Sequence, residues 1–349
     1  MKKATITTAA AVSLGLLLAA CGGGAEDSGN STEGESYTLR LGHGGAPGDV
    51  LNQSVDLLAE ILDERTDGRI VIENYGASQL GNERDLIEGI SMGTVDMTLV
   101  SSPPLGNFVP EALIYDLPGL FVDLEHAEKV AESPVVREYL AEALDQENLH
   151  LLTVTHGGFR GITNSRAPIE SIDDFAGLKM RVQESPMILA TYDALPGVNP
   201  VPIPIGDLYT ALDQGIADAQ ENPPILVRDF KIGEVQKYMT LTDHSYFPRH
   251  LIINSSTWES MSDSDKALFE EAAAEMQTFK NQYYRDETEN AIADLEEGGM
   301  EFVLEADDLR EDIAELMQEE VHPQFYDEIG GGDADRGREL IEQVLELAS

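Results

Sequence analysis

The 349-residue chain is poor in cysteine, in basic residues and in long hydrophobic runs. Its one cysteine, Cys21, cannot form an intramolecular disulfide, so core packing alone must hold the fold together. Only 22 lysine and arginine residues stand against 65 acidic ones, a formal net charge of −43. A surface this acidic repels nucleic acid and anionic lipid. No hydrophobic segment approaches the length of a transmembrane helix, so no membrane span is predicted.

The excess of acidic residues has two explanations, an acidic disordered tail or adaptation to high salt. The acidic residues are spread through the chain, and most of the basic residues are arginine. This distribution favours a salt-adapted surface, whose charges would be screened by concentrated salt.

Motifs of enzymes and metal sites are absent or out of context. The seven histidines show neither His-x-x-x-His nor His-Glu-x-x-His spacing, so no zinc site is predicted. Residues 89–93 match G-x-S-x-G, but Ser91 should end a helix, whereas a nucleophile elbow follows a strand. Residues 42–47 begin like a dinucleotide fingerprint, but Pro47 stands where its last glycine belongs. We therefore predict no catalytic residue, no metal and no cofactor.

The N-terminus has the order of a secretory signal peptide. Lys2 and Lys3 precede an apolar run at residues 9–20, too short to span a bilayer, which ends in Leu-Ala-Ala-Cys at Cys21. This ending resembles the lipobox of bacterial lipoproteins, which implies cleavage after residue 20 and lipid attachment to Cys21. Residues 21–36 are rich in glycine, serine and acids, and they predict a flexible tether between the lipid and a folded domain.

From residue 37 onward, strand and helix patterns alternate. Strands are expected at 37–41, 69–74, 95–100, 178–182 and 217–220, and helices at 50–65, 82–92 and 207–214. This order predicts an α/β protein with mainly parallel strands. The length after cleavage exceeds what one hydrophobic core supports, which favours two lobes.

One predicted helix is unusually long. Ser262 and Asp265 form a capping-box pattern, and the helical pattern then continues from Asp263 to Glu297, where two glycines end it. At 1.5 Å per residue these 35 residues would measure roughly 52 Å, longer than one lobe is wide. We expect a strut that belongs to both lobes. The alternative is a pair of helices broken near Asn281 or Asp286.

Three polar residues stand near the ends of predicted strands. Arg160 follows the apolar run 151–154, Arg181 lies just before the helix start at Ser185, and Asn222 ends the strand pattern at 217–220. Open α/β sheets bind ligands at the carboxyl ends of their strands, and an arginine there presents a planar fork to a carboxylate. The alternative for either arginine is a salt bridge to one of the many acids.

These segments also carry a resemblance to a known family. Residues 68–97, 105–121, 157–169, 177–185, 202–223 and 251–262, with the motifs GGFR, GLKMRV and QENP, resemble the DctP-type solute receptors of tripartite ATP-independent periplasmic (TRAP) transporters. The resemblance implies a two-lobe periplasmic-binding-protein fold of type II, with crossing hinge strands and a long helix spanning both lobes. The lobes would comprise residues 37–157 with about 246–285, and residues 158–245 with about 286–349.

The resemblance also implies ligand contacts. Arg181 would be the main partner of a ligand carboxylate, Arg160 a second carboxylate or polar contact, and Asn222 a further contact. We expect His43, Ser101 and Ser102 to engage the polar end of the ligand.

The function implied is capture of a small organic acid outside the cytoplasm and its delivery to membrane transporter subunits, with no nucleic acid as partner. C4-dicarboxylates, sugar acids, keto acids and aromatic acids would all satisfy an arginine clamp. Two other functions stay open, a receptor that signals ligand occupancy to a membrane protein and an exported lipoprotein enzyme.

Overall fold

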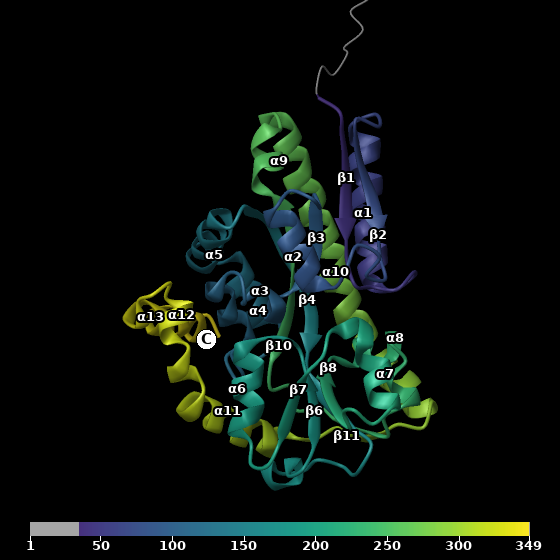
Figure 1. Cartoon of the computed structure of the whole chain (residues 1–349), viewed down its shortest axis with the longest axis vertical. Helices are drawn as coiled ribbons and strands as arrows, with labels where there is room; N and C mark the ends of the chain where they lie inside the picture. Colours follow the sequence, from purple (N-terminus) through teal and green to yellow (C-terminus); the bar gives the residue numbers. More distant parts are fainter. Residues whose placement is uncertain (1–34, 349) are drawn as a thin grey trace, which may run out of the picture. The chain divides into compact units, whose positions relative to one another are not determined.

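The computed structural model describes residues 35–348 (Figure 1). The predicted signal peptide, the lipid site Cys21 and nearly all of the predicted tether lie outside these residues. Within the described part, no helix has both the length and the apolar character needed to cross a membrane.

The first sheet, sheet A, has five strands in the order β2-β1-β3-β10-β4. Strand β1 is parallel to β2 and β3, whereas β10 lies antiparallel between β3 and β4. The strand bounds are β1 Tyr37–Gly42, β2 Ile70–Tyr75, β3 Met97–Ser101, β4 Leu149–Phe159 and β10 Tyr246–Asn254. All side chains of β3 and β10 are buried, including Arg249, His250 and Asn254 of β10.

The second sheet, sheet B, has six strands in the order β11-β9-β5-β8-β6-β7. Strand β6 is parallel to β7 and β8, and β9 is parallel to β11, whereas β5 is antiparallel to both β8 and β9. The bounds are β5 Gly161–Asn164, β6 Lys179–Val182, β7 Asn199–Pro202, β8 Ala219–Asn222, β9 Tyr238–Thr240 and β11 Glu301–Val303.

Both sheets are mixed: within the described residues five of the nine strand pairings are parallel and four are antiparallel, so parallel pairing dominates less than expected. Every antiparallel pairing involves β5 or β10, the strands at which the chain passes between the sheets. Strand β4 of sheet A continues through Arg160 into β5 of sheet B, and β9 returns through residues 241–245 to β10. The chain thus crosses between the two sheets along extended segments, which confirms the predicted crossing strands.

A glycine pair shapes the first crossing. A Cβ on Gly157 would lie 2.3 Å from the carbonyl oxygen of Phe247, so no larger residue fits there. Gly158 has a φ of +88°, which L side chains rarely adopt. The close approach and the turn therefore both require glycine at the point where β4 leaves sheet A.

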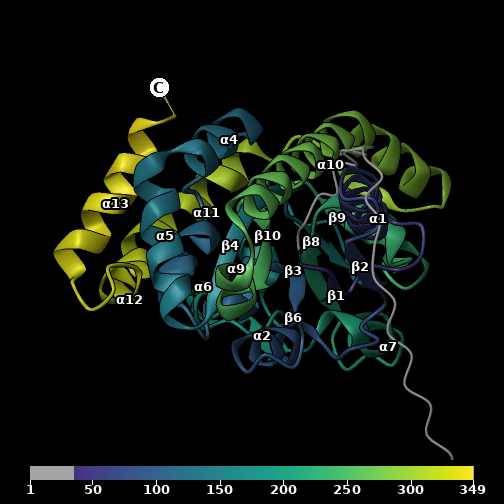
Figure 2. The same cartoon turned by 90° about the horizontal axis from the view of Figure 1, so that it is seen from above.

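The long helix α10 is one unbroken element, Asp263–Glu297, as expected. It packs against α1 and β4 (Figure 2), and also against α8. Its polar side chains bind the free backbone edge of β4: Gln277 donates to the Val154 carbonyl at 2.6 Å, Asn281 accepts from the His156 N–H at 2.9 Å, and Lys280 donates to the His156 carbonyl. The helix thereby supplies hydrogen bonds that a further strand would otherwise make.

The remaining helices cover the sheets. Their bounds are α1 Val50–Arg65, α2 Glu83–Ser91, α3 Ser102–Leu105, α4 Leu124–Glu132, α5 Pro134–Gln146, α6 Pro186–Ala194, α7 Leu208–Asp213, α8 Pro224–Asp229, α9 Ser255–Ser260, α11 Asp307–Glu320, α12 Tyr326–Ile329 and α13 Ala334–Glu346. Short 3₁₀ helices are η1 Pro110–Asp116, η2 Ile172–Phe175, η3 Ile205–Asp207, η4 Ile232–Glu234 and η5 His322–Gln324. Ser91 is the last residue of α2, as expected, which rejects a nucleophile elbow there.

The C-terminal helices return to the elements of sheet A. Tyr139 of α5 donates to the carbonyl of Ile329 at the end of α12, and the ring of His126 in α4 lies 2.7 Å from the carbonyl oxygen of Val344 in α13. The sequence assignment placed both helices in the second lobe. The lobe boundaries stay a prediction. The two contacts show that α12 and α13 pack against α5 and α4, which were assigned to the first lobe.

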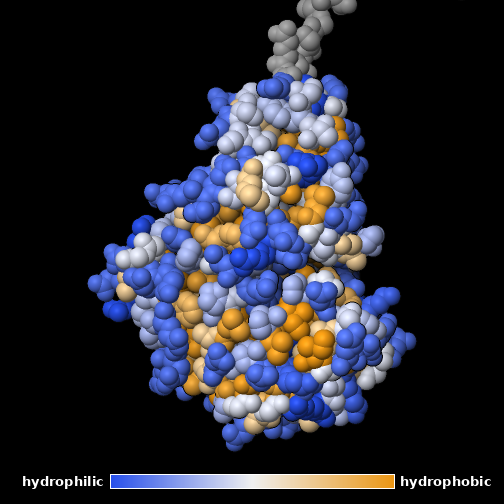
Figure 3. Space-filling model, viewed as in Figure 1, coloured by the Kyte–Doolittle hydropathy of each residue, from blue (hydrophilic) through white to orange (hydrophobic). Residues whose placement is uncertain are grey.

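The face of the molecule in Figure 3 is mostly hydrophilic, with apolar residues in small separate groups. Such a surface fits a chain in which acids outnumber basic residues about threefold.

Candidate functional site

Arg181 is fully buried near the end of β6, with an exposed fraction of 0%. Its Nε donates to the carbonyl oxygen of Ile203 at 2.8 Å, but neither Nη1 nor Nη2 has a hydrogen-bond partner. Burial lowers the pKa of the guanidinium to about 10, so it keeps its charge at neutral pH. Both terminal NH2 groups of this charged side chain can therefore donate to a bound anion.

Arg181 lines a small pocket of about 20 Å³. Arg181 is the one lining residue that lies in a strand, and the others belong to helices and loops that follow strands of the two sheets: Asn82, Glu83, Arg84, Pro104, Gln183, Glu184, Pro204 and Ile205. The mixture of an arginine fork, amides and carboxylates is suited to a small polar anion.

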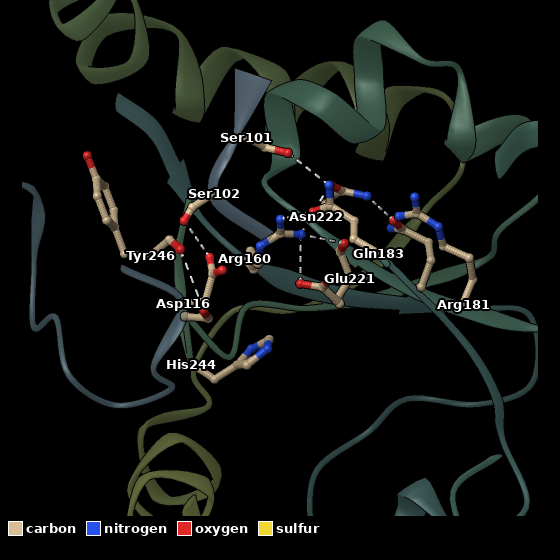
Figure 4. A network of polar contacts seen from close by, with 12 residues as sticks. Ser101, Ser102, Asp116, Arg160, Arg181, Gln183, Glu221, Asn222, His244 and Tyr246 are labelled. Carbon is tan, nitrogen blue, oxygen red and sulfur yellow. Dashed lines mark hydrogen bonds and ion pairs between the residues drawn. The ribbon is translucent and has the colours of Figure 1, made fainter. Parts of the chain in front are cut away.

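Arg160, at the crossing between β4 and β5, is enclosed by a dense polar network (Figure 4). Its Nη1 donates to the Glu221 carboxylate at 2.8 Å and to the Glu221 carbonyl at 3.0 Å, and its Nη2 donates to Gln183. The ring of Phe247 lies 4.1 Å from the guanidinium carbon. Arg160 therefore forms a salt bridge with the buried carboxylate of Glu221, which is the alternative that the sequence analysis left open for this arginine.

The register of sheet B brings Asn222 to this network. Strand β5 pairs with β8 so that Gly161 is opposite Asn222, which places Arg160 beside the end of β8. The Asn222 side-chain oxygen accepts from Arg160 at 3.4 Å, and its amide nitrogen donates to Gln220. Asn222 is thus close to Arg160, as expected for neighbouring strand ends.

A second network centres on Glu83, the first residue of α2. The carboxylate of Glu83 accepts from the Ser101 N–H at 3.0 Å, the Ser101 hydroxyl at 2.7 Å and Nη1 of Arg249 at 2.6 Å. Strand register explains this meeting, because Arg249 in β10 is opposite Ser101 in β3. Gln183 then joins the networks of the two sheets by donating to the Ser101 hydroxyl at 3.0 Å.

Ser102 has a separate partner. Its hydroxyl donates to Asp116 at 2.8 Å, and the other oxygen of Asp116 is buried without a partner. Burial raises the pKa of Asp116 to about 8, so this carboxyl is mostly protonated at neutral pH. The serine therefore belongs to a neutral buried pair rather than to the pocket wall.

His43, in the loop after β1, is engaged elsewhere. One ring nitrogen lies 2.7 Å from the Asn74 side-chain oxygen, and the other accepts from the Gly45 N–H at 3.0 Å. Burial lowers its pKa, which keeps the ring neutral. His43 is not among the residues that line the pocket, so its predicted ligand contact has no support in this arrangement.

Sequence reasoning missed several residues of the site. Gln183 lies two positions after Arg181. Glu221 directly precedes Asn222, so the QENP motif already contained the carboxylate that pairs with Arg160. Glu83 and Arg249 carried no usable signal, because their pairing depends on strand register over 166 residues of separation. Among residues 35–348, no group of histidine, cysteine and acidic side chains could hold a metal ion.

The arrangement can bind and enclose an anion. Arg181 offers a two-pronged donor inside a pocket whose wall also contains the start of α2 and Pro104 of α3, and Gln183 links the hydrogen-bond networks of the two sheets. A carboxylate is the ligand that best matches a guanidinium fork.

Comparison with known proteins gives one consistent family. The family model for DctP, described as bacterial extracellular solute-binding protein, family 7, matches residues 41–328. The chain is 30% identical to the 2,3-diketo-L-gulonate-binding periplasmic protein YiaO of Escherichia coli, over 89% of this chain and 92% of that one. It is also 30% identical to the C4-dicarboxylate-binding periplasmic protein DctP of Rhodobacter capsulatus, over 76% of this chain and 79% of that one.

The fold agrees with that of solved structures. A TRAP periplasmic solute-binding protein from Polaromonas, bound to D-erythronate, superposes with a TM-score of 0.81 at 33% identity and covers 90% of this chain and 100% of its own.

Proposed function

Because the chain belongs to the DctP family of TRAP-type extracytoplasmic solute-binding proteins, which are binding proteins rather than enzymes, we propose that it captures a small organic acid at Arg181 and delivers it to the membrane subunits of a TRAP transporter. The ligand would be held between the two sheets, and an ion gradient across the membrane would drive its uptake.

The observation that carries this proposal is the state of Arg181. A buried guanidinium with two unpaired nitrogens is unfavourable, because the charge has left water without gaining a counter-charge. A bound carboxylate supplies the charge and two aligned acceptors at once. The site is therefore built for an anion, and the organic acids bound by the relatives fit that requirement.

Closure of the protein follows from contacts between the sheets. Gln183 of sheet B donates to Ser101 of sheet A at 3.0 Å, and Asn107 donates to the Glu184 carbonyl at 2.6 Å. These bonds form only when the two sides meet, so they stabilise the closed form. A ligand that neutralises Arg181 removes the main cost of that closed form, which couples binding to closure.

We place the protein outside the cytoplasm, held at a membrane by lipid on Cys21. The lipobox pattern supports the anchor, and the family supports the compartment. Mass spectrometry of the mature protein tests the anchor, because a diacylglycerol mass must disappear in Cys21→Ser.

The test of the binding function is a thermal-shift and calorimetric screen of the protein against organic acids and neutral analogues in high salt. A ligand at 1,000 times its Kd stabilises the folded state by about 4 kcal/mol, or about 6 °C for a domain of roughly 315 residues. Arg181→Ala should bind every acid at least 100-fold more weakly and still fold, because its side chain makes only one hydrogen bond. The matched control is Arg338→Ala on the exposed face of α13.

Equal affinity of Arg181→Ala and the parent protein would contradict the assigned role. Absence of binding to any acid would contradict the proposed function itself. Turnover of a bound acid would instead identify an exported enzyme.

A further inference from the structure

The negative charge of the protein is spread over many elements rather than gathered in one region. Residues 35–348 contain 62 acidic and 20 basic residues, a net charge of −42. Helix α10 has eleven acidic residues against three basic ones, and α11, which lies apart from it in Figure 2, has seven against one. Seen from outside the molecule, this distribution acts as one large negative charge, which repels an approaching organic anion.

The cation that we assign to the ligand lies inside this negative exterior. Arg181 is fully buried, and both of its terminal nitrogens are without a hydrogen-bond partner. Arg84, a half-exposed residue of the same pocket wall, has its Nε 3.2 Å from the carboxylate of Glu88, so this surface cation already has a counter-ion. A ligand carboxylate must therefore cross a repulsive field before it reaches the attractive charge of Arg181.

Salt acts differently on the repulsion and on the attraction. The Debye length is about 10 Å at 0.1 M ionic strength and about 3 Å at 1 M, so concentrated salt removes a repulsion that acts over tens of ångströms. A buried guanidinium in hydrogen-bond contact with a carboxylate is screened much less, because mobile ions do not enter between the two groups. Higher salt should therefore weaken the repulsion and leave the attraction nearly unchanged.

The size of the effect follows from the net charge and the radius of the protein. A domain of roughly 315 residues corresponds to a sphere of about 25 Å radius. For a net charge of −42, the screened Coulomb energy at that surface predicts that a monovalent anion reaches the protein about eightfold more often at 1 M than at 0.1 M ionic strength. For a divalent anion this factor is squared, because the work of approach doubles.

We propose that salt promotes capture of the organic acid, because it screens the acidic exterior while the buried site at Arg181 keeps its attraction. The proposal rests on the proposed function, since it takes an organic acid as the ligand and Arg181 as its partner. The association rate constant should rise with salt, the dissociation rate constant should stay nearly the same, and Kd should fall in proportion. An anion that binds to a protein of positive net charge behaves in the opposite way, because salt then weakens a long-range attraction.

Binding kinetics at graded ionic strength test the proposal. The protein is mixed with an excess of erythronate, galactonate or succinate in stopped flow with intrinsic fluorescence, and calorimetry gives Kd under the same conditions. The series is run in sodium chloride and in sodium sulfate, because screening depends on ionic strength whereas competition for Arg181 depends on the anion of the salt. For a monovalent probe we expect the association rate constant to rise about eightfold from 0.1 M to 1 M, equally in both salts.

Variants of the exterior assign the effect to the net charge. Glu270, Glu289, Glu296 and Glu297 are exposed residues of α10 and do not line the pocket. Their replacement by lysine reduces the negative charge by eight and should raise the association rate constant about twofold at 0.1 M and much less at 1 M. The matched control has aspartate at the same four positions, which keeps the charge and should leave the rate constant unchanged. Circular dichroism at each salt concentration verifies that every variant is folded.

The outcomes separate the two proposals. Suppose that an acid binds and that its binding is lost in Arg181→Ala. An association rate constant that falls or stays level as ionic strength rises then overturns the salt effect and leaves the proposed function standing. A rise that differs between chloride and sulfate, or a lysine variant with the parent's rate constant at 0.1 M, also overturns it. Failure of every acid to bind at any salt concentration overturns the proposed function and this proposal together.

Discussion

Replacing Glu221 with Gln should destabilise the protein strongly although it changes few atoms. Both members of the Arg160–Glu221 pair have 1% exposed side chains, and their charged atoms are 2.8 Å apart. Burial raises the pKa of Glu221, and the neighbouring Arg160 and Arg181 oppose that rise. Glu221→Gln keeps the shape but leaves Arg160 charged and buried without a counter-charge, a change that typically costs about 3–5 kcal/mol.

The expected loss is large enough to measure by calorimetry. Unfolding entropy near 60 °C is about 2.1 cal/mol/K per residue, so a domain of roughly 315 residues should lose about 5–8 °C in Tm for that free energy. The control is Glu301→Gln, which breaks the exposed pair with Lys237 at 3.1 Å. Its members have side chains 54% and 60% exposed, so solvent screens the interaction and the change in Tm should be within about 1.5 °C.

A double variant distinguishes loss of the pair from loss of packing. Arg160→Met with Glu221→Leu removes both charges and fills similar volume, so it should recover at least half of the stability lost by Glu221→Gln. A Glu221→Gln protein within 1 kcal/mol of the parent in urea unfolding would refute the reasoning, because it would mean that Arg160 does not depend on this counter-charge.

Two further predictions concern other buried titratable groups. The Asp116 carboxyl has a pKa of about 8 when folded and about 4 when unfolded, so its contribution to stability falls as pH rises from 4 to 8. Asp116→Asn should therefore gain several degrees in Tm relative to the parent across that window; a constant difference would contradict the raised pKa. His250 is buried with both ring nitrogens unpaired, so His250→Leu should stabilise by about 1 kcal/mol in urea unfolding. A loss of stability would show that its ring nitrogens have partners.

Local patterns in the sequence predicted individual elements well. The 3.6-residue spacing predicted α1 with the bounds Val50–Arg65, and the helix start at Ser185 and the continuity of α10 are also confirmed. Each of these depends on neighbours within a few residues, which is the range over which periodicity and capping act.

Pairings between distant segments could not be predicted in the same way. Nothing local indicates that β10 lies between β3 and β4, and this placement makes sheet A mixed, as the placement of β5 between β8 and β9 does for sheet B. The partner of Arg160 was equally hidden, because 65 acidic residues compete for it and only the register of β5 and β8 selects Glu221. Of the predicted ligand residues, Arg181, Arg160, Asn222 and Ser101 lie in one connected region, whereas His43 and Ser102 have other partners.

The position of β10 also determines the order in which the chain can assemble. Sheet A cannot be completed until residues 246–254 are available, although its first strand begins at Tyr37. During export, all strands of sheet B except β11 therefore emerge before sheet A can close. Until then β3 and β4 expose unpaired backbone edges, which are sites for aggregation. The nascent chain should thus depend on chaperones until β10 has emerged, and truncation before residue 254 should yield insoluble protein.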